Sequence, residues 1–325
     1  MLVLEENDVE TLLPMADAIE VLDAVMRDVA RGATELPLRF AMPVGDDNKM
    51  GVMPGAIPDP ACYGIKLVSL FPGNPARGLS SHRGAIVLFE AETGGAVAMM
   101  DAGLLTALRT AAASAVATRA LARAQAQTLA IVGYGEQAWH HLAAIRAVRP
   151  IRRLAVAGRD AGKAAAFAAR AAARYPALEI SSSDDVARAV AGADIVCTVT
   201  ASPTPVLMGD WLAEGAHVNV VGASIPSMRE VDDRLVERGD IWVDYLPSAL
   251  AQAGEIVDMI AAGRLRATDL KGEIGAVLAG DAPGRATADQ ITIYRSLGVA
   301  AQDLACAWRV LERAEAQGRG QRVRL

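Results

Sequence analysis

The sequence predicts an α/β protein built around a doubly wound parallel sheet, and three observations support this fold class. Short apolar runs alternate with helical stretches between residues 129 and 244, as in sheets whose parallel strands are joined by helices. A glycine-rich turn, Gly133–Ala138, follows the first of these runs and opens a helix. Residues 1–100 instead carry proline-rich turns and a hairpin signal, which indicates a separate, mostly antiparallel region.

The first hundred residues predict one helix followed by several strands. Apolar residues repeat with a helical period inside Asp17–Arg31. Five prolines between Pro37 and Pro60 then predict only short strands and turns. The further expected elements are a strand at 65–70, a loop at 71–78, and a hairpin of strands 85–89 and 96–100 around the turn 92–95.

The rest of the chain predicts a long helix and then the parallel sheet. Residues 104–123 are rich in alanine and other good helix formers. Short, almost wholly apolar strands follow, as expected for a sheet covered on both faces. The last helix comes after the sheet, and we expect it to pack on the first region. The expected strands are 129–132, 153–157, 194–198, 217–221 and 240–244, and the helices are 136–148, 161–174 and 299–317.

The composition argues against several classes of protein. Of 325 residues, 52% are hydrophobic, and the formal net charge is -6, which disfavours disorder and a nucleic-acid partner. No apolar run reaches the roughly 20 residues of a membrane span, and the acidic first segment does not resemble a secretory signal. The three cysteines are widely spaced and form no metal motif. We therefore expect a cytoplasmic protein with neither a membrane nor a metal partner.

The segment Gly133–Ala138 carries the clearest chemical signal. Its sequence, GYGEQA, fits the pattern GxGxxA and lies between a predicted strand and a predicted helix. Gly133 permits the tight turn, Gly135 lets the backbone approach a pyrophosphate, and Ala138 allows the helix to pack closely on the strand. The amino terminus of the helix stabilises the phosphate charge. The segment therefore predicts a Rossmann domain that binds a dinucleotide.

The choice of dinucleotide depends on the end of the second strand of this domain. An acid there binds the ribose 2′-hydroxyl of NAD, whereas an arginine accommodates the 2′-phosphate of NADP. Arg159 comes directly after Gly158, Asp160 follows it, and Lys163 lies one helical turn further on. This order favours NADP over NAD, although a solvated Arg–Asp turn without a ligand would look the same.

Three basic residues lack acidic neighbours in the sequence. Lys66 lies inside an apolar strand, Arg39 follows Pro37 and Leu38, and Arg109 lies in an almost uncharged helix. A lysine in such a strand either extends to a sheet edge or points into a site, and the pattern alone favours the edge. The three cations could instead converge on a carboxylate, which arginine binds through two parallel hydrogen bonds. His82, between two strands, has no assigned role.

These residues, in this order, resemble the ornithine cyclodeaminase/mu-crystallin family. The resemblance covers nearly the whole chain, and the succession of lysine strand, LRTAAAS helix and glycine turn is specific. The segments that carry it are 37–39 (PLR), the strand with Lys66, 71–74 (FPGN), 78–82 (GLSSH), 107–114 (ALRTAAAS), 133–138 (GYGEQA), 217–222 (HVNVVG), 228–230 (MRE) and 294–298 (YRSLG).

The resemblance implies a domain organisation and an assembly. Residues 1–116 plus 301–325 would form a domain for substrate binding and dimerisation. A Rossmann domain, residues 117–300, would be inserted into it, with the active site in the cleft and the protein a homodimer.

The resemblance also implies the site residues, to which Arg159 and Asp160 are added from the strand argument above. Substrate binding falls on Arg39, Met53, Lys66, Ser81 and Arg109, and catalysis on Lys66 and Ser224. Cofactor binding falls on Arg109, Thr110, Gly133, Tyr134, Gly135, Glu136, Gln137, Ala138, Arg159, Asp160, Thr200, Ala201, Gly222 and Ser296.

One departure from the family pattern separates the possible activities. Cyclodeaminating members carry an acid where this chain has Ser224, and a carboxylate there can act as general base. Reduction of a protonated imine needs mainly a placed hydride, a clamp for the carboxylate and exclusion of water. We therefore expect an NAD(P)H-dependent reductase of α-imino acids, or an amino-acid dehydrogenase. The alternatives are an ornithine cyclodeaminase with bound NAD and a cofactor-binding protein without turnover.

Overall fold

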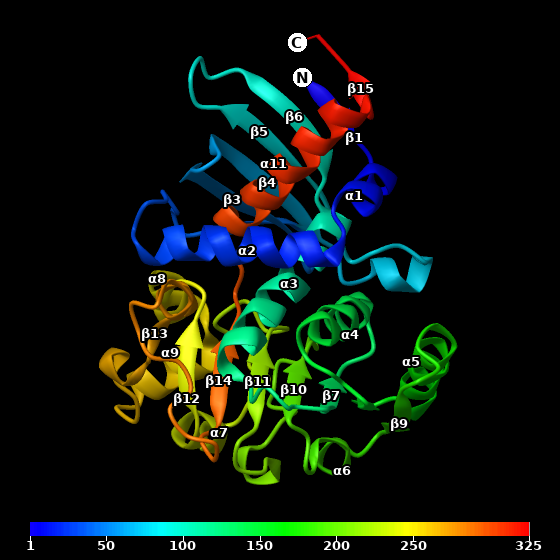
Figure 1. The fold of residues 1–325 in the computed structure, drawn as a ribbon, viewed down its shortest axis with the longest axis vertical. Coiled ribbons are helices and arrows are strands. Elements are labelled where there is room, and N and C mark those ends of the chain that lie inside the picture. Colours follow the sequence, from blue (N-terminus) through cyan, green and yellow to red (C-terminus); the bar gives the residue numbers. More distant parts are fainter. Residues whose placement is uncertain (325) are drawn as a thin grey trace. The chain divides into compact units, whose positions relative to one another are not determined.

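The computed structural model describes residues 1–324, apart from the side chains of Pro75 and His82, and divides into two compact units (Figure 1). Unit 1 comprises Met1–Thr110 and the chain from Gly298 onward, and unit 2 comprises Ala111–Leu297. Helix α3 (Gly103–Leu121) contains the first boundary, and α11 (Ala300–Gln317) begins just after the second. A parallel sheet in unit 2 and a mostly antiparallel sheet in unit 1 confirm the expected α/β class.

Unit 1 is built on a seven-stranded sheet with the order β15-β1-β6-β5-β4-β3-β2. Strands β2 to β6 pair antiparallel with their neighbours, and β1 joins β6 in parallel. The expected hairpin is confirmed as β5 and β6. The strands are β1 (Leu2–Leu4), β2 (Phe40–Gly45), β3 (Asn48–Pro58), β4 (Ala61–Leu70), β5 (His82–Glu90), β6 (Ala96–Asp101) and β15 (Gln321–Arg322).

The proline-rich segment differs from its prediction. Instead of short strands and turns, Asn48–Pro58 forms one long strand that pairs with β4 along its whole length. The pairing of β3 with β2 ends at Val52. Pro54, which has no backbone N–H, is therefore tolerated because β3 has no β2 partner at this position. The expected loop is interrupted by a short 3-10 helix, η1 (Asn74–Arg77).

The helices of unit 1 include two that were expected, and both are confirmed. Helix α2 (Met15–Ala30) packs on α11, and α11 also lies against β3, β4 and β5 (Figure 1). The buried face of α11 carries Leu304 but also the polar residues Gln302 and Asp303. An amide and a carboxylate on a buried face need hydrogen-bond partners inside the unit. A shorter helix, α1 (Glu6–Leu12), contacts α11 as well.

Unit 2 contains an eight-stranded sheet with the order β13-β12-β14-β11-β10-β7-β8-β9, parallel throughout. The order reverses between β7 and β10, which confirms the doubly wound prediction. The sequence does not predict β9 or β14, because neither has a strong apolar run. The strands are β7 (Thr128–Val132), β8 (Arg153–Ala157), β9 (Glu179–Ser183), β10 (Ile195–Thr198), β11 (His217–Val220), β12 (Asp240–Val243), β13 (Gly272–Glu273) and β14 (Thr292–Arg295).

The helices of unit 2 include both that the sequence predicts, α4 and α5, at the expected bounds. The others are short and follow the later strands. The helices are α4 (Glu136–Val148), α5 (Ala161–Arg174), α6 (Val186–Val190), α7 (Asp233–Arg238), α8 (Leu246–Gln252), α9 (Gly254–Ala261) and α10 (Ile274–Ala279), with 3-10 turns η2 (Gly209–Trp211) and η3 (Ala267–Asp269).

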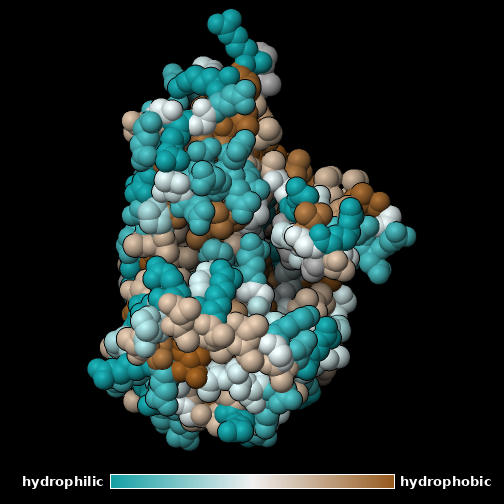
Figure 2. Space-filling model, turned by 90° about the vertical axis from the view of Figure 1, so that its right-hand side faces the viewer, coloured by the Kyte–Doolittle hydropathy of each residue, from teal (hydrophilic) through white to brown (hydrophobic). Residues whose placement is uncertain are grey.

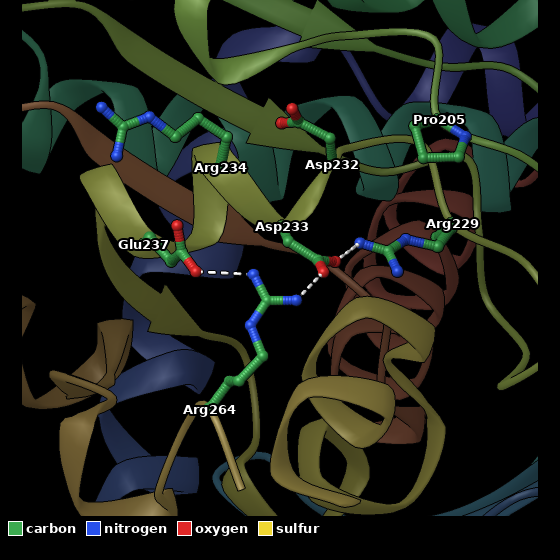
Figure 3. A pocket seen from close by; sticks show the side chains of 7 residues that line it. All are labelled: Pro205, Arg229, Asp232, Asp233, Arg234, Glu237 and Arg264. Carbon is green, nitrogen blue, oxygen red and sulfur yellow. Dashed lines mark hydrogen bonds and ion pairs between the residues drawn. The ribbon is translucent and has the colours of Figure 1, made fainter. Parts of the chain in front are cut away.

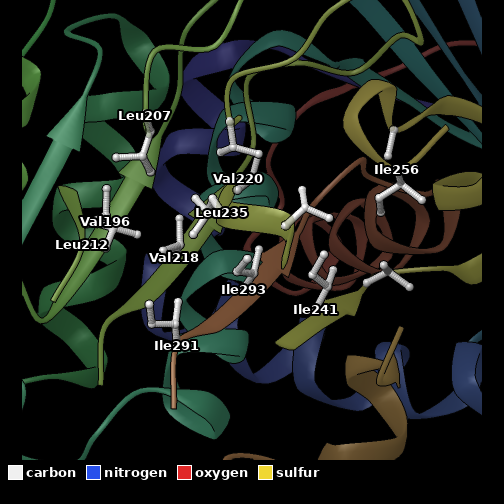
Figure 4. Packing of buried hydrophobic residues seen from close by; sticks show 14 of the residues in the cluster. Val196, Leu207, Leu212, Val218, Val220, Leu235, Ile241, Ile256, Ile291 and Ile293 are labelled. Atoms are coloured by element: carbon white, nitrogen blue, oxygen red, sulfur yellow. The ribbon is translucent and has the colours of Figure 1, made fainter. Parts of the chain in front are cut away.

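One large apolar cluster binds the strands of unit 2 to their covering helices (Figure 4). Val218, Ile241 and Ile293 come from three strands and meet Leu235 of α7 and Ile256 of α9. All are buried, and burying such a side chain contributes about 2 kcal/mol. This packing fixes the strands of unit 2 against α7 and α9.

The surface offers one notable apolar segment. On the face drawn in Figure 2, hydrophilic residues predominate and hydrophobic residues form small groups. In and just before β2, however, Leu38, Phe40, Met42 and Val44 are between 46% and 58% exposed. Searching the described part of the chain, we find no helix with the length and hydropathy of a membrane span.

Candidate active site

A buried group of charged side chains lies inside unit 1. Lys66 comes from the middle of β4, Arg109 from α3 and Asp303 from α11. One oxygen of Asp303, Oδ1, accepts hydrogen bonds from Lys66 Nζ and from Arg109 Nε, both at 2.9 Å. These side chains are 2%, 5% and 0% exposed. The fold therefore brings together charges that lie far apart in the sequence.

Further contacts hold the two cations of this group. The hydroxyl of Thr106 accepts a hydrogen bond from Lys66 Nζ at 3.3 Å, and the amide oxygen of Gln302 accepts one from Arg109 at 2.9 Å. Gly298 leaves room for the guanidinium, since a Cβ there would lie 2.4 Å from a terminal nitrogen of Arg109. A larger residue at 298 would displace Arg109.

The location of Lys66 gives it unusual acid–base properties. Burial and the neighbouring charge of Arg109 lower the pKa of Lys66 to about 7, against the opposing effect of Asp303. An amine with such a pKa can give up and regain a proton near neutral pH. The interpretation that pattern alone favours, a lysine extending to a sheet edge, is wrong, because β4 is an inner strand and Lys66 is buried.

Other predicted substrate residues also belong to unit 1. Met53 is buried on β3 and pairs in register with Lys66. Arg39 is half-buried just before β2, and its charge contributes to the lowered pKa of Lys66. Ser81 is half-buried just before β5. His82 is the first residue of β5, but its side chain lies outside the described structure.

The cluster carries more positive than negative charge. Lys66 and Arg109 share the single carboxylate of Asp303, and Arg39 adds a further positive charge nearby. A buried cation without a full counter-charge is costly, so a bound anion would stabilise the group. A small carboxylate matches this need, because arginine binds carboxylates through two parallel hydrogen bonds.

In unit 2, several predicted cofactor residues gather at one edge of the sheet. Gly133, Thr200, Gly222 and Ser296 follow β7, β10, β11 and β14, which are adjacent parallel strands. A Cβ on Gly222 would lie 2.0 Å from the carbonyl oxygen of Thr200, and one on Gly133 would lie 2.9 Å from that of Val199. The loops are therefore in contact. This edge, at the reversal of strand order, is where parallel sheets bind ligands.

The glycine turn opens onto the amino terminus of α4. Gly133 has a φ of 122°, a value that side-chain-bearing residues rarely adopt. Gly135 is the N-cap of α4, and a Cβ placed on it would meet no atom within 4 Å. Glu136, the first residue of the helix, is exposed. The backbone at this helix terminus is therefore accessible to an anion such as a pyrophosphate.

The surroundings of the turn fit a bound dinucleotide. Ala138 is fully buried, and Tyr134 lies over Gly158, where a Cβ would come within 2.5 Å of its ring. Gln137 Oε1 in the first turn of α4 and Ser296 Oγ after β14, which belong to predicted cofactor residues, are among the buried polar atoms without a hydrogen-bond partner in the described residues. Buried polar atoms are almost always paired. The hydroxyl, amide and phosphate groups of a dinucleotide are partners of the required kind.

The two residues after β8 play different parts. The carboxylate of Asp160 caps α5 by accepting from the Lys163 N–H at 3.0 Å. Arg159 is exposed and has no ion-pair or hydrogen-bond partner within the described chain. Of the remaining predicted cofactor residues, Thr110 is buried on α3 and Ala201 is exposed after β10.

A buried acid to which the sequence analysis assigns no role, Glu230 of the segment 228–230, organises two of these loops. Glu230 accepts hydrogen bonds from the backbone N–H and hydroxyl of Thr200, at 2.6 and 2.7 Å. Its second oxygen accepts from the Gly222 N–H at 2.6 Å and the Thr198 hydroxyl at 2.9 Å. Ser224 lies two residues beyond Gly222 and is half-buried. Glu230 therefore holds the loop that carries Ser224.

Glu230 and Asp303 are the functional candidates that sequence reasoning missed. Asp303 is a single acid in the largely apolar first half of α11, and Glu230 stands among other charged residues (Arg229, Asp232 and Asp233). Both are weak signals, because acids are usually solvated. Their partners come from other strands and helices, so only the folded chain reveals them.

A second charged group lines an open hollow on unit 2 (Figure 3). Arg264 pairs with Asp233 and with Glu237, the latter at 2.6 Å, and Arg229 also pairs with Asp233. These exposed charges satisfy one another, and such pairs contribute little. The hollow is therefore a poor candidate for a site. Nowhere in the described chain do three His, Cys, Asp or Glu side chains group to hold a metal ion.

The geometry defines a class of protein. A parallel sheet with an open helix terminus after its first strand, in one chain with a buried lysine–arginine cluster, indicates a dinucleotide-dependent oxidoreductase for small carboxylates. The chain belongs to the ornithine cyclodeaminase/mu-crystallin family, whose sequence profile matches residues 1–318.

Curated relatives match along most of this chain. The Delta(1)-pyrroline-2-carboxylate reductase of Bacillus cereus is 32% identical over 327 residues, which cover 99% of each chain. The ketimine reductase mu-crystallin of Mus musculus is 32% identical over 293 residues, 89% of each chain. The alanine dehydrogenase of Archaeoglobus fulgidus is 32% identical over 329 residues, 99% of this chain and 98% of the relative.

Solved structures share the fold over the full length. The Delta(1)-pyrroline-2-carboxylate reductase of Thermococcus litoralis, in complex with NADH and L-proline, has a TM-score of 0.95 and 31% identity. The match covers 99% of this chain and 100% of the reductase. An archaeal alanine dehydrogenase dimer with bound NAD has a TM-score of 0.93 and 30% identity, and the match covers 100% of this chain and 99% of the dehydrogenase chain. A lysine cyclodeaminase has a TM-score of 0.86 and 31% identity, and the match covers 100% of this chain and 95% of the cyclodeaminase. The fold alone therefore does not separate reduction from cyclodeamination.

Proposed function

We propose that this protein is an NAD(P)H-dependent reductase of α-imino acids, which in reverse acts as an amino-acid dehydrogenase. The observation that carries the proposal is the sharing of one buried carboxylate, Asp303, by Lys66 and Arg109. This arrangement leaves positive charge for a ligand carboxylate beside a lysine that exchanges its proton near neutral pH. The full-length relatives named as imino-acid reductases and as an alanine dehydrogenase support the same reaction class.

The three cations of unit 1, Arg39, Lys66 and Arg109, each have a part in the proposed reaction. Arg39 and Arg109 bind the substrate carboxylate and so fix the orientation of the imine. Lys66 donates the proton that the imine nitrogen takes up as the C=N bond is reduced. When bound, the reduced nicotinamide supplies the hydride that forms the new C–H bond. One imino acid, one hydride and one proton thus give one amino acid.

The remaining site residues orient the substrate and limit its size. Ser81 and Ser224 hold the substrate or a water molecule through their hydroxyl groups. Met53, beside Lys66 in the sheet, provides an apolar wall and no charge for a distal amine. We therefore expect small substrates, such as the cyclic imines pyrroline-2-carboxylate and piperideine-2-carboxylate, and imines of pyruvate type.

Ser224 favours reduction over cyclodeamination. Cyclodeamination requires proton removal and attack by the side-chain amine, steps that a carboxylate at this position would assist. A serine hydroxyl is a far weaker base near neutral pH. The choice of activity therefore rests on this side chain.

The cofactor residues proposed in unit 2 act mainly through backbone groups. Gly133, Gly135 and the first turn of α4 bind the pyrophosphate, and Ser296 and Gln137 contribute buried polar atoms. We assign NADP as the preferred cofactor, because Arg159 finds no partner in the described part of the chain, whereas the Asp160 carboxylate is used as a helix cap. The related solved structures hold NADH or NAD, so both cofactors need to be tested.

We also propose a homodimer and a cytoplasmic location. The apolar residues Leu38, Phe40, Met42 and Val44 alternate along the edge of the unit 1 sheet, so they share one face, and such exposed stripes mark association surfaces. The archaeal alanine dehydrogenase relative is a dimer. Light scattering should give twice the chain mass, and Phe40→Glu should shift it to a monomer. The three buried cysteines are free, which suits a reducing compartment.

The first test of the proposed function is oxidation of NADPH and NADH, followed at 340 nm. The panel contains pyrroline-2-carboxylate, piperideine-2-carboxylate, and pyruvate, glyoxylate and oxaloacetate, each keto acid with ammonia or methylamine. We expect turnover with at least one imino acid and faster turnover with NADPH.

Two other results would redirect the assignment. Release of ammonia from ornithine without net change in the cofactor would identify a cyclodeaminase. Cofactor binding without any turnover on the panel or on ornithine would identify a binding protein.

A further inference from the structure

The proposed reaction gives roles to Lys66 and Arg109 but none to Asp303, which contacts both. Its carboxylate is fully buried on α11, and a single oxygen, Oδ1, accepts from both cations at 2.9 Å. Lys66 Nζ and Arg109 Nε are therefore held within two hydrogen-bond lengths of each other. In an α-imino acid, the carboxylate and the imine nitrogen are attached to the same carbon atom. One small ligand can therefore meet an arginine with its carboxylate and a lysine with its nitrogen.

The surroundings of Lys66 oppose its charged form from nearly every side. Across the sheet its neighbours are Met53 on β3 and Ile86 on β5, both apolar and buried. Arg109 on α3 and Arg39 before β2 repel an ammonium group. From α3, Thr106 offers only a hydroxyl oxygen, at 3.3 Å.

Asp303 on α11 provides the opposing effect. Its negative charge and its hydrogen bond both raise the pKa of Lys66, which burial and the arginines lower to about 7. Buried lysines without such a partner lose their proton at still lower pH.

We propose that Asp303 is a positioning residue for imine reduction: it keeps Lys66 protonated and in place beside Arg109. The inference rests on the proposed function, because it assigns Lys66 as the proton donor. Without the Asp303 carboxylate, Lys66 would be mostly a neutral amine at neutral pH, with no proton to give. Its chain would also lose the contact that holds Nζ beside Arg109.

The experiment measures the protonation of Lys66 directly in the full-length protein. The chain has only four lysines, Lys49, Lys66, Lys163 and Lys271, and all but Lys66 are exposed. Protein labelled with carbon-13 at the lysine ε-carbon should thus give four NMR resonances, with Lys66 assigned by its loss in Lys66→Arg. In the wild type we expect the Lys66 resonance to titrate near neutral pH.

The decisive variant is Asp303→Asn, which keeps the shape of the side chain and removes its charge. The Lys66 resonance should titrate about one pH unit or more lower, while the other three curves stay unchanged. At pH 7, kcat/KM for the best imino acid should fall at least about fivefold and recover partly at lower pH. A merely structural role would change stability but not the Lys66 titration.

Gln302→Leu is the matched control, because Gln302 contacts Arg109 but not Lys66. This variant should raise KM for the imino acid and leave the Lys66 titration in place. If Asp303→Asn does not fold, Asp303→Ser takes its place and must show the same displacement.

The outcomes separate this inference from the proposed function. An unmoved Lys66 titration in the folded Asp303 variant overturns the role of Asp303, even if the wild type reduces imines. A wild type that reduces no imino acid, with the Lys66 titration displaced as expected, overturns the proposed function but leaves the electrostatic contact established. Displacement together with the matching loss in kcat/KM supports both.

Discussion

The candidate sites of the two units are built from different chemical groups. In unit 1, the cluster consists of long charged side chains, Lys66, Arg109 and Asp303, inserted from a strand and two helices into a buried space. In unit 2, the candidate site consists of backbone and short side chains at the carboxyl edge of a parallel sheet, with Gly133 and Gly135 in the turn that opens α4. The first presents charge, and the second presents open space and backbone N–H groups.

This difference predicts that substitutions in the two units affect different steps of the reaction. A buried charge affects proton transfer and carboxylate binding, and its removal alters chemistry more than folding if its partners remain paired. A glycine in a tight loop sets how closely a ligand can approach the backbone. Substitutions in unit 1 should therefore change kcat/KM for the imino acid, and substitutions in unit 2 should change cofactor affinity.

The largest expected effect is from Lys66→Met. The variant removes the proposed proton donor, and Asp303 remains paired with Arg109. We expect kcat/KM to fall by about a thousandfold, with NADPH affinity, measured by fluorescence titration, within twofold of wild type as an approximate limit. Lys271→Met, on the surface of unit 2, is the control and should keep full activity. Activity within about tenfold of wild type would remove Lys66 from the chemistry.

The second prediction compares two glycines of the same turn. Gly135→Val should weaken cofactor binding by about a hundredfold with little change in melting temperature, because the added atoms occupy open space in the unliganded protein. Gly133→Val should lower both the cofactor affinity and the melting temperature. Residue 133 has a positive φ, and the carbonyl group of Val199 leaves no room for a side chain. Fluorescence titration and calorimetry check the pair. Normal cofactor affinity in Gly135→Val would be incompatible with a pyrophosphate at this helix.

The third prediction concerns pH. Lys66 must hold a proton in order to donate it, and its pKa lies at about 7. The value of kcat/KM should therefore be highest below pH 7 and fall by about tenfold per pH unit above it. Lys66→Arg cannot lose its proton in this range, so its lower activity should show no such fall. A wild-type profile that stays flat to pH 9 would show that Lys66 is not the donor.

The smallest expected effect is on cofactor choice. Arg159→Ser removes the exposed cation after β8 and should raise KM for NADPH about tenfold, with KM for NADH nearly unchanged. Arg153→Ser, at the amino end of β8 and so far from the loop that carries Arg159, serves as the control. Equal effects of Arg159→Ser on both cofactors would show that Arg159 does not select NADP.

Much of unit 2 could be predicted, and less of unit 1. Helices α4 and α5 have the bounds that the sequence predicts, because each follows a local periodic pattern between clear turn signals. The segment that forms β3 does not, since its prolines suggest breaks that pairing with β4 overrides. The resemblance singles out Lys66 and Arg109, but nothing local indicates Asp303, which lies 194 residues from Arg109.

By itself, the sequence determined the α/β class, the doubly wound sheet, the glycine turn and the presence of serine rather than an acid at position 224. These depend on composition, periodicity and residue identity, which are local properties. Only the tertiary structure decided that Lys66 is buried rather than extended to an edge, that one oxygen of Asp303 holds both Lys66 and Arg109, and that Glu230 joins two loops. Burial and charge pairing depend on which distant segments pack together, and one-dimensional patterns do not encode these distances directly.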